Sequence, residues 1–151
     1  MRAAARATGE VLRDLGLAPH AMTTGSRGLH VTVPLRRRAT FEEVRAFAHA
    51  VAERLVEQDP RRLTLEWSKQ KRGDRIYVDV NRNARAQHAV APWAVRARPT
   101  APVAVPLRWE ELSDRRLKPG RWTVRDIEAR LADAGDPWHG IARHAKSLPR
   151  L

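Results

Sequence analysis

The segment TTGSRGLHVTVPL, residues 23–35, constrains the fold most, because it places a tight turn directly before a strand. Two glycines and an arginine form the turn, and the run that follows alternates leucine and valine with His30 and Thr32. Successive side chains of a strand point to opposite faces. We therefore predict a strand over 29–33 that ends at Pro34, with an apolar face toward the core and His30 on the other face.

A capped helix is predicted directly after this strand. Thr40 and Glu43 have the spacing of a capping box, and Asp59-Pro60 ends the pattern, so the helix is expected over 41–57. A first helix is expected over 2–16, with Gly16 after its last turn. The expected apolar stripe of the second helix consists of Phe41, Val44, Ala48, Val51 and Leu55.

Shorter elements follow a similar logic. A strand is predicted near 20–23 and another in IYVDV, where Tyr77 and Asp79 point away from the apolar side chains. RLTLEW fits a strand or the start of a helix. Four of the ten prolines lie in 89–106, which predicts extended chain with an edge strand at Val103 and Val105. A helical turn is expected at 108–112, and a helix from Thr123 with the stripe Val124, Ile127 and Leu131.

Helices and strands therefore alternate irregularly along 151 residues. This pattern predicts a single domain, 1–151, of the α/β (α+β) class, with helices packed on a mixed β-sheet. The absence of cysteine excludes disulfides and thiolate metal sites and fits a cytoplasmic location. No apolar run approaches the ~20 residues that cross a bilayer, so no membrane partner is expected.

The charge of the chain predicts a phosphate-bearing partner. Lysine and arginine number 29 against 17 acidic residues, for a net charge of +12, and 25 of the 29 are arginine. Guanidinium groups bind phosphate oxygens in a bidentate manner. A GC-rich genome would explain the ratio of arginine to lysine, but it does not explain the excess of positive charge. Nucleic acid and nucleotides are the favoured partner class.

The turn before the predicted strand has the chemistry of an anion site. Backbone N–H groups of a glycine turn can converge on an anion, and Arg27 adds a charged fork. If strands 29–33 and 76–80 share a sheet, His30 and Asp79 stand on one polar face. A nucleotide site is built in this way, with hydrogen-bond donors for the phosphates and a carboxylate for the divalent ion that neutralises them. Simpler interpretations are a hairpin turn, a structural histidine and an arginine-paired Asp79. Arg36–Arg38 fit a solvated loop.

Other chemistries lack their signatures. HExxH, Walker A and GxSxG patterns do not occur in the sequence. His139 and His144 are five residues apart, which is the wrong spacing for two ligands on one helix face. Most of the five tryptophans are expected in the core, although Trp93 beside Arg96 and Arg98 has the setting of a base-stacking residue.

Taken in order, these segments resemble the archaeo-eukaryotic primase superfamily, and specifically the polymerase domain of bacterial DNA ligase D. TTGSRGLHVTVPL resembles the family's second motif, S-G-x-x-G-x-H followed by a strand. Residues 69–112 resemble the block with the third-motif aspartate and an arginine pair, and WTVRDIEARLADAGDPW resembles its usual ending. The likeness runs from about Ala3 to Trp138.

The resemblance implies a role for each matched position. It implies a nucleotide-phosphate motif at 23–35 and a third metal-binding carboxylate at Asp79, with manganese or magnesium as cofactor. It also implies nucleoside triphosphates, DNA ends and a DNA ligase or end-binding protein as partners. Thr24 stands where the family usually has serine, and Arg27 where lysine is common. The implied nucleotide-binding residues are Thr24, Ser26, Arg27, His30, Arg72, Arg96 and Arg98.

One element of the resembled family has no counterpart in this sequence. The family carries an Asp-x-Asp pair on a strand before the first helix seen here, and no Asp-x-Asp occurs in these 151 residues. Two-metal catalysis needs several oxygen ligands. The chain therefore resembles the C-terminal part of an incomplete primase-like core, expected to be weak or inactive alone. A non-catalytic binder of DNA ends or nucleotides and a poorly folding decayed copy are the alternatives.

Overall fold

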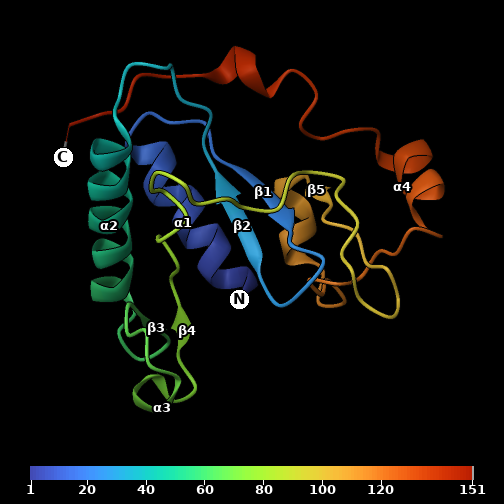
Figure 1. The fold of residues 1–151 in the computed structure, drawn as a ribbon, viewed down its shortest axis with the longest axis horizontal. Coiled ribbons are helices and arrows are strands. Elements are labelled where there is room, and N and C mark those ends of the chain that lie inside the picture. Colours follow the sequence, from blue (N-terminus) through green and yellow to red (C-terminus); the bar gives the residue numbers. More distant parts are fainter. Residues whose placement is uncertain (151) are drawn as a thin grey trace.

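The computed structural model describes residues 1–150. Helices α1 and α2 pack against each other and lie beside a small central sheet, and the C-terminal part of the chain arches back toward α2 (Figure 1). The elements are α1 (Arg2–Asp14), β1 (His20–Thr23), β2 (Leu29–Thr32), α2 (Phe41–Gln58), β3 (Leu63–Thr64), α3 (Lys69–Arg72), β4 (Ile76–Tyr77), β5 (Pro106–Leu107), the 3-10 turn η1 (Trp109–Ser113), α4 (Ile127–Ala134) and the 3-10 turn η2 (Ile141–His144). The predicted α/β class is confirmed, with helices flanking small sheets.

The predicted capping box opens α2. Thr40 Oγ1 accepts a hydrogen bond from the backbone of Glu43 at 3.2 Å, and the Glu43 carboxylate accepts one from the backbone of Thr40 at 2.7 Å. The predicted stripe is wrong at its start, because Phe41 is 57% exposed. Val44 and Ala48 are only half-buried, since they line an open groove. The buried side chains are Phe47, Val51, Ala52 and Leu55.

The expected single mixed sheet is divided into two. β1 pairs antiparallel with β2 on one side and with β5 on the other, whereas β3 and β4 form a separate parallel pair. RLTLEW thus contributes a strand. The strand predicted over 76–80 stops at Tyr77, because turns replace it: the backbone N–H of Asn81 donates to Asp79 Oδ1, and that of Asn83 donates to the carbonyl of Val80.

The C-terminal elements begin later in the chain than predicted. α4 begins at Ile127, because the backbone and hydroxyl of Thr123 both donate to the Asp126 carboxylate and form a turn before the helix. The predicted apolar stripe is wrong, since Val124 is 49% and Leu131 is 41% exposed. The edge strand is β5, which begins one residue after Val105 and three residues after Val103. Both valines are buried in the core.

The core consists of three clusters around the central sheet. One packs α1 on β5 and η1, a second lies between α1 and α2, and a third gathers Met22, Ala104 and Trp138 on the opposite face. Trp93, whose sequence setting is that of a base-stacking residue, is half-buried and packs against the first cluster. Trp67 is 72% exposed. Within residues 1–150, no helix is long and apolar enough to cross a membrane.

Candidate nucleotide-phosphate site

The turn between β1 and β2 is closed by the side chain of Thr24. Its Oγ1 donates to the carbonyl of Gly28 at 2.9 Å and accepts from the backbone N–H groups of Ser26 at 3.3 Å and Gly28 at 3.2 Å. The N–H groups of such a turn are predicted to bind an anion, but the threonine hydroxyl occupies two of them. The turn is therefore closed by hydrogen bonds among its own residues, and the exposed Arg27 lies at its tip.

Gly25 fixes the position of this turn against the rest of the molecule. Its φ is +62°, and a Cβ built there would lie 2.7 Å from Arg96 Cγ, 3.0 Å from the carbonyl carbon of Val103 and 3.1 Å from the nitrogen of Ala104. The absence of a side chain thus lets the turn approach the 96–104 segment closely. Arg96 is thereby brought beside the turn from 71 positions further along the chain.

His30 lies near charges of both signs. Burial is the main reason that its pKa lies below the usual 6.5, and the positive charges of Arg96 and Arg82 lower the pKa further, whereas Asp79 raises it. His30 is therefore neutral at pH 7 and can act as a hydrogen-bond donor through one ring nitrogen. Asp79, Arg82 and Arg96 come from outside β2, so this environment is formed only by the tertiary structure.

Asp79 is placed differently from its prediction, although it lies near His30. Asp79 follows β4 and does not lie within the strand. Because β4 and β2 belong to different sheets, the condition that strands 29–33 and 76–80 share one sheet is not met. The Asp79 carboxylate is exposed and accepts a hydrogen bond from the backbone of Asn81 at 3.0 Å. No arginine forms an ion pair with it within residues 1–150, which leaves the carboxylate open to solvent.

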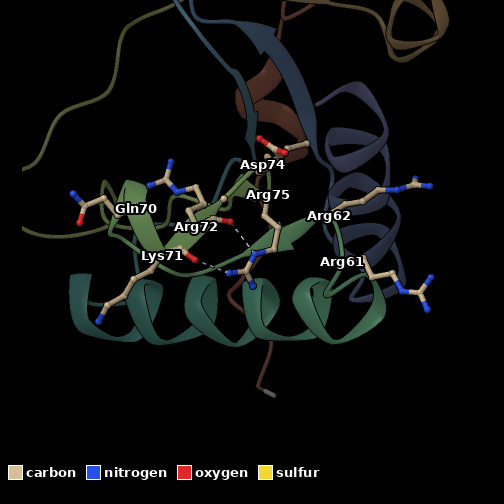
Figure 2. Close-up of a pocket in the computed structure, with 9 residues that line it drawn as sticks. Arg61, Arg62, Gln70, Lys71, Arg72, Asp74 and Arg75 are labelled. Carbon is tan, nitrogen blue, oxygen red and sulfur yellow. Dashed lines mark hydrogen bonds between the residues drawn. The ribbon is translucent and has the colours of Figure 1, made fainter.

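A basic hollow of about 630 Å³ lies next to this region around α3 (Figure 2). Arg75 donates to the carbonyl oxygens of Arg72 and Lys71, both at 3.0 Å, which holds its guanidinium against the end of α3. Arg72 donates to the carbonyl of Trp67 at 3.0 Å and stacks on the Tyr77 ring at 4.5 Å. Arg72 is thus immobilised on the face that carries Tyr77.

Several basic residues of this region are not identified from the local sequence patterns. Arg61, Arg62, Lys71 and Arg75 line the hollow with Arg72, and Arg82 acts on His30. Of the segment KQKRGDR, residues 69–75, only Arg72 was predicted as a site residue; the signal that could have identified the others is the density of cations in that segment. Arg98 is exposed in the loop after Arg96, and Ser26 is half-buried in the glycine turn.

The side chains present do not fit a two-metal site. Within residues 1–150, no group of three or more histidine, cysteine, aspartate or glutamate side chains could hold a metal ion. Asp79 is the only carboxylate lining the large groove beside β2. These residues supply cations and a glycine turn, but too few oxygen ligands for paired metal ions.

Comparison with known proteins places this geometry in a family. The model of the LigD primase-polymerase domain matches residues 1–138. The chain belongs to this family. The multifunctional non-homologous end joining protein LigD of Pseudomonas aeruginosa is 39% identical over 134 residues, covering 87% of this chain and 16% of that protein. LigD of Mycobacterium bovis is 33% identical over 147 residues, covering 97% of this chain and 19% of that protein.

A solved structure agrees with the family assignment. The polymerase domain of Mycobacterium tuberculosis ligase D, determined in complex with DNA, superposes with a TM-score of 0.87 at 30% identity. The match covers 95% of this chain and 50% of that one. The chain therefore has a LigD-type polymerase-domain fold, and it spans half of that solved domain and less than a fifth of the two LigD proteins named above.

Two histidines give this LigD-family chain a predicted pH dependence of stability. The pKa of His20 is lowered by burial and by the positive charge of His144, whose ring stacks on it at 5.5 Å, and the pKa of His30 is also lowered. Below pH 6.5 the unfolded chain therefore binds more protons than the folded chain, so the free energy of unfolding falls as the pH falls. Thermal melts from pH 7.5 to 5 should show a declining Tm.

Replacement of one histidine at a time separates this effect from general acid sensitivity. His20→Gln should flatten the fall in Tm below pH 6.5, because the depressed group is removed. His88→Gln is the matched control, since His88 is exposed and lies in a loop. An equal flattening by both variants would contradict the assignment to His20.

Proposed function

We propose that this chain is the nucleotide- and DNA-end-binding part of a ligase-D-type polymerase domain, whose reaction class is template-dependent nucleotidyl transfer in non-homologous end joining. The observation that carries the proposal is the convergence of Arg96 on the glycine turn and on His30. The resemblance assigns His30, Thr24 and Arg27 to the triphosphate of an incoming nucleotide, and Arg96 to the basic positions that line the nucleotide and template side. Nucleoside triphosphates, DNA ends and a ligase or end-binding partner are the proposed ligands.

In this proposal each residue acts through charge or hydrogen bonding. Arg27 and Arg96 provide guanidinium forks for phosphate oxygens, and the neutral His30 donates one hydrogen bond. Phosphate binding raises the proton affinity of His30, because the new negative charges oppose the arginines that lower its pKa. Asp79 is the proposed metal-ligand carboxylate, and its solitary position is the reason that the isolated chain is proposed to be weak or inactive.

Primer extension tests the catalytic part of the proposal. The purified chain, with a primed template, nucleoside triphosphates and manganese, should give no extension above the level of an Asp79→Asn variant. The physical reason is that one carboxylate cannot hold two ions in register. A complete LigD polymerase domain serves as the positive control. Robust extension that depends on Asp79 would contradict the proposed weakness of the chain.

A non-catalytic DNA-binding role is favoured by the same charges, and salt titration tests it. The logarithm of the affinity for a labelled duplex end should fall linearly with the logarithm of salt concentration, with a slope of about −0.9 per phosphate neutralised. Arg96→Ala with Arg98→Ala should weaken binding and reduce the slope by about 2. The fluorescence anisotropy of the labelled DNA reports both quantities.

The control for this experiment removes more charge from a different place. Arg36, Arg37 and Arg38 are exposed in the loop before α2, and their triple alanine variant removes one more charge than the Arg96 and Arg98 pair. If binding depends on position rather than net charge, the triple variant loses less affinity. A larger loss from the triple variant, or a flat salt response of the unaltered chain, would contradict the proposed binding surface.

A further inference from the structure

We propose that His20 and His144 bind one divalent transition-metal ion, with zinc as the ion that fits their geometry, and that the bound ion fastens the C-terminal segment 139–150 to β1. The spacing of His139 and His144 argued against a ligand pair on one helix face. The structure instead places His144 beside a histidine 124 positions away. The proposed site does not depend on nucleotide or DNA binding.

The two rings face each other through one nitrogen each. His20 Nε2 and His144 Nδ1 lie 3.4 Å apart, whereas the ring centroids are 5.5 Å apart and the ring planes differ by 9°. The nitrogens therefore lie on the facing edges of the rings. Two nitrogens bound to one tetrahedral zinc ion at about 2.0–2.1 Å are themselves about 3.3–3.4 Å apart. The observed separation is thus that of two ligands on a shared ion.

A hydrogen bond between the rings is the other way to use these two nitrogens. At 3.4 Å it is longer than the range of about 2.7–3.2 Å in which N–H donors usually bond. It also needs a proton on one of the two facing nitrogens, whereas a metal ion accepts the lone pairs of both. Neutral imidazole, the form that binds metal, predominates at pH 7.5. A metal ion therefore satisfies this pair better than a hydrogen bond does.

His20 is held in place before any ion binds. It is the first residue of β1 and pairs with Thr32 in the antiparallel ladder. The Trp138 ring packs edge-on against it, with the ring centroids 6.0 Å apart. Trp138 is only 9% exposed, and its indole N–H donates to the carbonyl of Ala21 at 3.1 Å. One ligand of the proposed site is therefore fixed by a strand and a buried ring, as a preformed metal site requires.

His144 is presented by a segment that is held on both sides of it. This residue is the last of η2, in the part of the chain that arches back toward α2 (Figure 1). Trp138 anchors the segment before η2. After η2, the carbonyl of Lys146 accepts from the backbone N–H of Arg36 at 2.8 Å, and the N–H of Lys146 donates to the carbonyl of Pro34 at 3.2 Å. A bound ion adds a third link, between η2 and β1.

The ligands determine which ions the site takes. Imidazole nitrogens suit zinc, copper and nickel, whereas magnesium and manganese prefer oxygen ligands. Within residues 1–150, no third histidine, cysteine, aspartate or glutamate completes a group with this pair, so water fills the other coordination positions. The affinity is therefore expected to be lower than that of a structural zinc site with four protein ligands. The ion is also of a different class from the one implied for the polymerase reaction.

Titration calorimetry of the full 151-residue chain with zinc chloride at pH 7.5 tests the proposal. One ion should bind per chain. His144→Gln should weaken binding by at least about ten-fold, because a single imidazole remains. His144 is exposed, so this change leaves the core intact.

Two matched controls each remove one exposed histidine elsewhere, and neither should change the affinity. His139→Gln removes the other histidine of the C-terminal segment. His49→Gln removes the rival pair on α2, in which His49 Nδ1 lies 3.3 Å from the Glu53 carboxylate.

Two further measurements test the fastening of the C-terminal segment. Zinc should slow hydrogen exchange of the amides of 141–146, because the ion opposes local opening of η2. At a hundred-fold excess over its Kd, zinc should raise the Tm by about 5 °C or more in the unaltered chain and not in His144→Gln, and a chelator should reverse the rise. Magnesium should have neither effect.

Four results would overturn the proposal. They are the absence of zinc binding, equal binding by the unaltered chain and His144→Gln, a greater loss of affinity in His49→Gln than in His144→Gln, and zinc binding without slower exchange at 141–146. The third result would assign the zinc to α2, and the fourth would show that the ion does not fasten the segment.

Discussion

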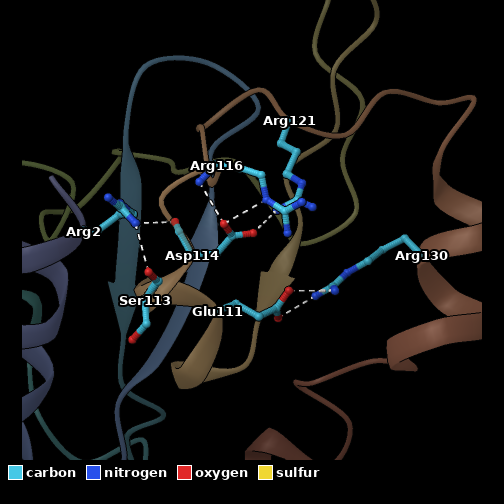
Figure 3. A network of polar contacts seen from close by, with 7 residues as sticks. All are labelled: Arg2, Glu111, Ser113, Asp114, Arg116, Arg121 and Arg130. Atoms are coloured by element: carbon cyan, nitrogen blue, oxygen red, sulfur yellow. Dashed lines mark hydrogen bonds and ion pairs between the residues drawn. The ribbon is translucent and has the colours of Figure 1, made fainter.

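Replacing Arg130 with alanine is expected to lower the free energy of unfolding by about 3–5 kcal/mol, the range typical of breaking one side of a buried ion pair. The Arg130 side chain is 7% exposed, and its guanidinium binds the Glu111 carboxylate through two contacts of 2.7 Å (Figure 3). It also donates to the carbonyl of Pro106 at 3.2 Å and lies over the Trp122 ring at 4.8 Å. Its loss leaves a carboxylate without its partner and detaches α4 from β5.

Chemical denaturation measures this effect, and two variants control it. Arg125→Ala removes an exposed arginine close by in sequence and should change the free energy of unfolding by less than about 0.5 kcal/mol. Glu111→Gln keeps an oxygen for the backbone N–H of Arg108 but removes the charge opposite Arg130, so it should also destabilise. Equal stabilities of Arg130→Ala and Arg125→Ala would show that the ion pair does not hold α4.

Replacing Gly25 with alanine is expected to destabilise the chain by at least about 2 kcal/mol. The left-handed backbone alone costs a residue with a side chain roughly 1–2 kcal/mol. The new Cβ would also meet the backbone of Val103 and Ala104 at 3.0 and 3.1 Å, which cannot yield as a flexible side chain can. The turn must therefore move away from Arg96, so DNA or nucleotide affinity should fall with stability.

Gly28→Ala is the matched control in the same turn. A Cβ at Gly28 meets nothing within 4 Å, and its φ is not in the left-handed region. Its expected change in the free energy of unfolding is within about 0.5 kcal/mol. Thermal denaturation and anisotropy of both variants provide the comparison. If Gly28→Ala is as harmful as Gly25→Ala, the close approach of the turn to the 103–104 backbone is not what positions the site.

Local signals in the sequence were sufficient for the elements with strong ends. The Thr40–Glu43 capping box, the glycine turn and the period-two run at 29–33 each depend on neighbours within a few residues, and the structure contains all three elements. The same reasoning failed where distant groups compete. Val124 and Leu131 form a plausible stripe, but the buried side of α4 is set by Arg130 and its ion pair with Glu111, which is 19 positions away.

The sequence by itself determined that this chain is basic, of the α/β class and similar to ligase-D-type polymerase domains, because charge, periodicity and local motifs are properties of short segments. The tertiary structure alone decided that Asp79 lies beyond the end of β4, that two sheets face one groove, and that Arg96 packs against Gly25. The physical reason is that these features depend on backbone pairing and close packing between segments tens of residues apart, which no local pattern encodes.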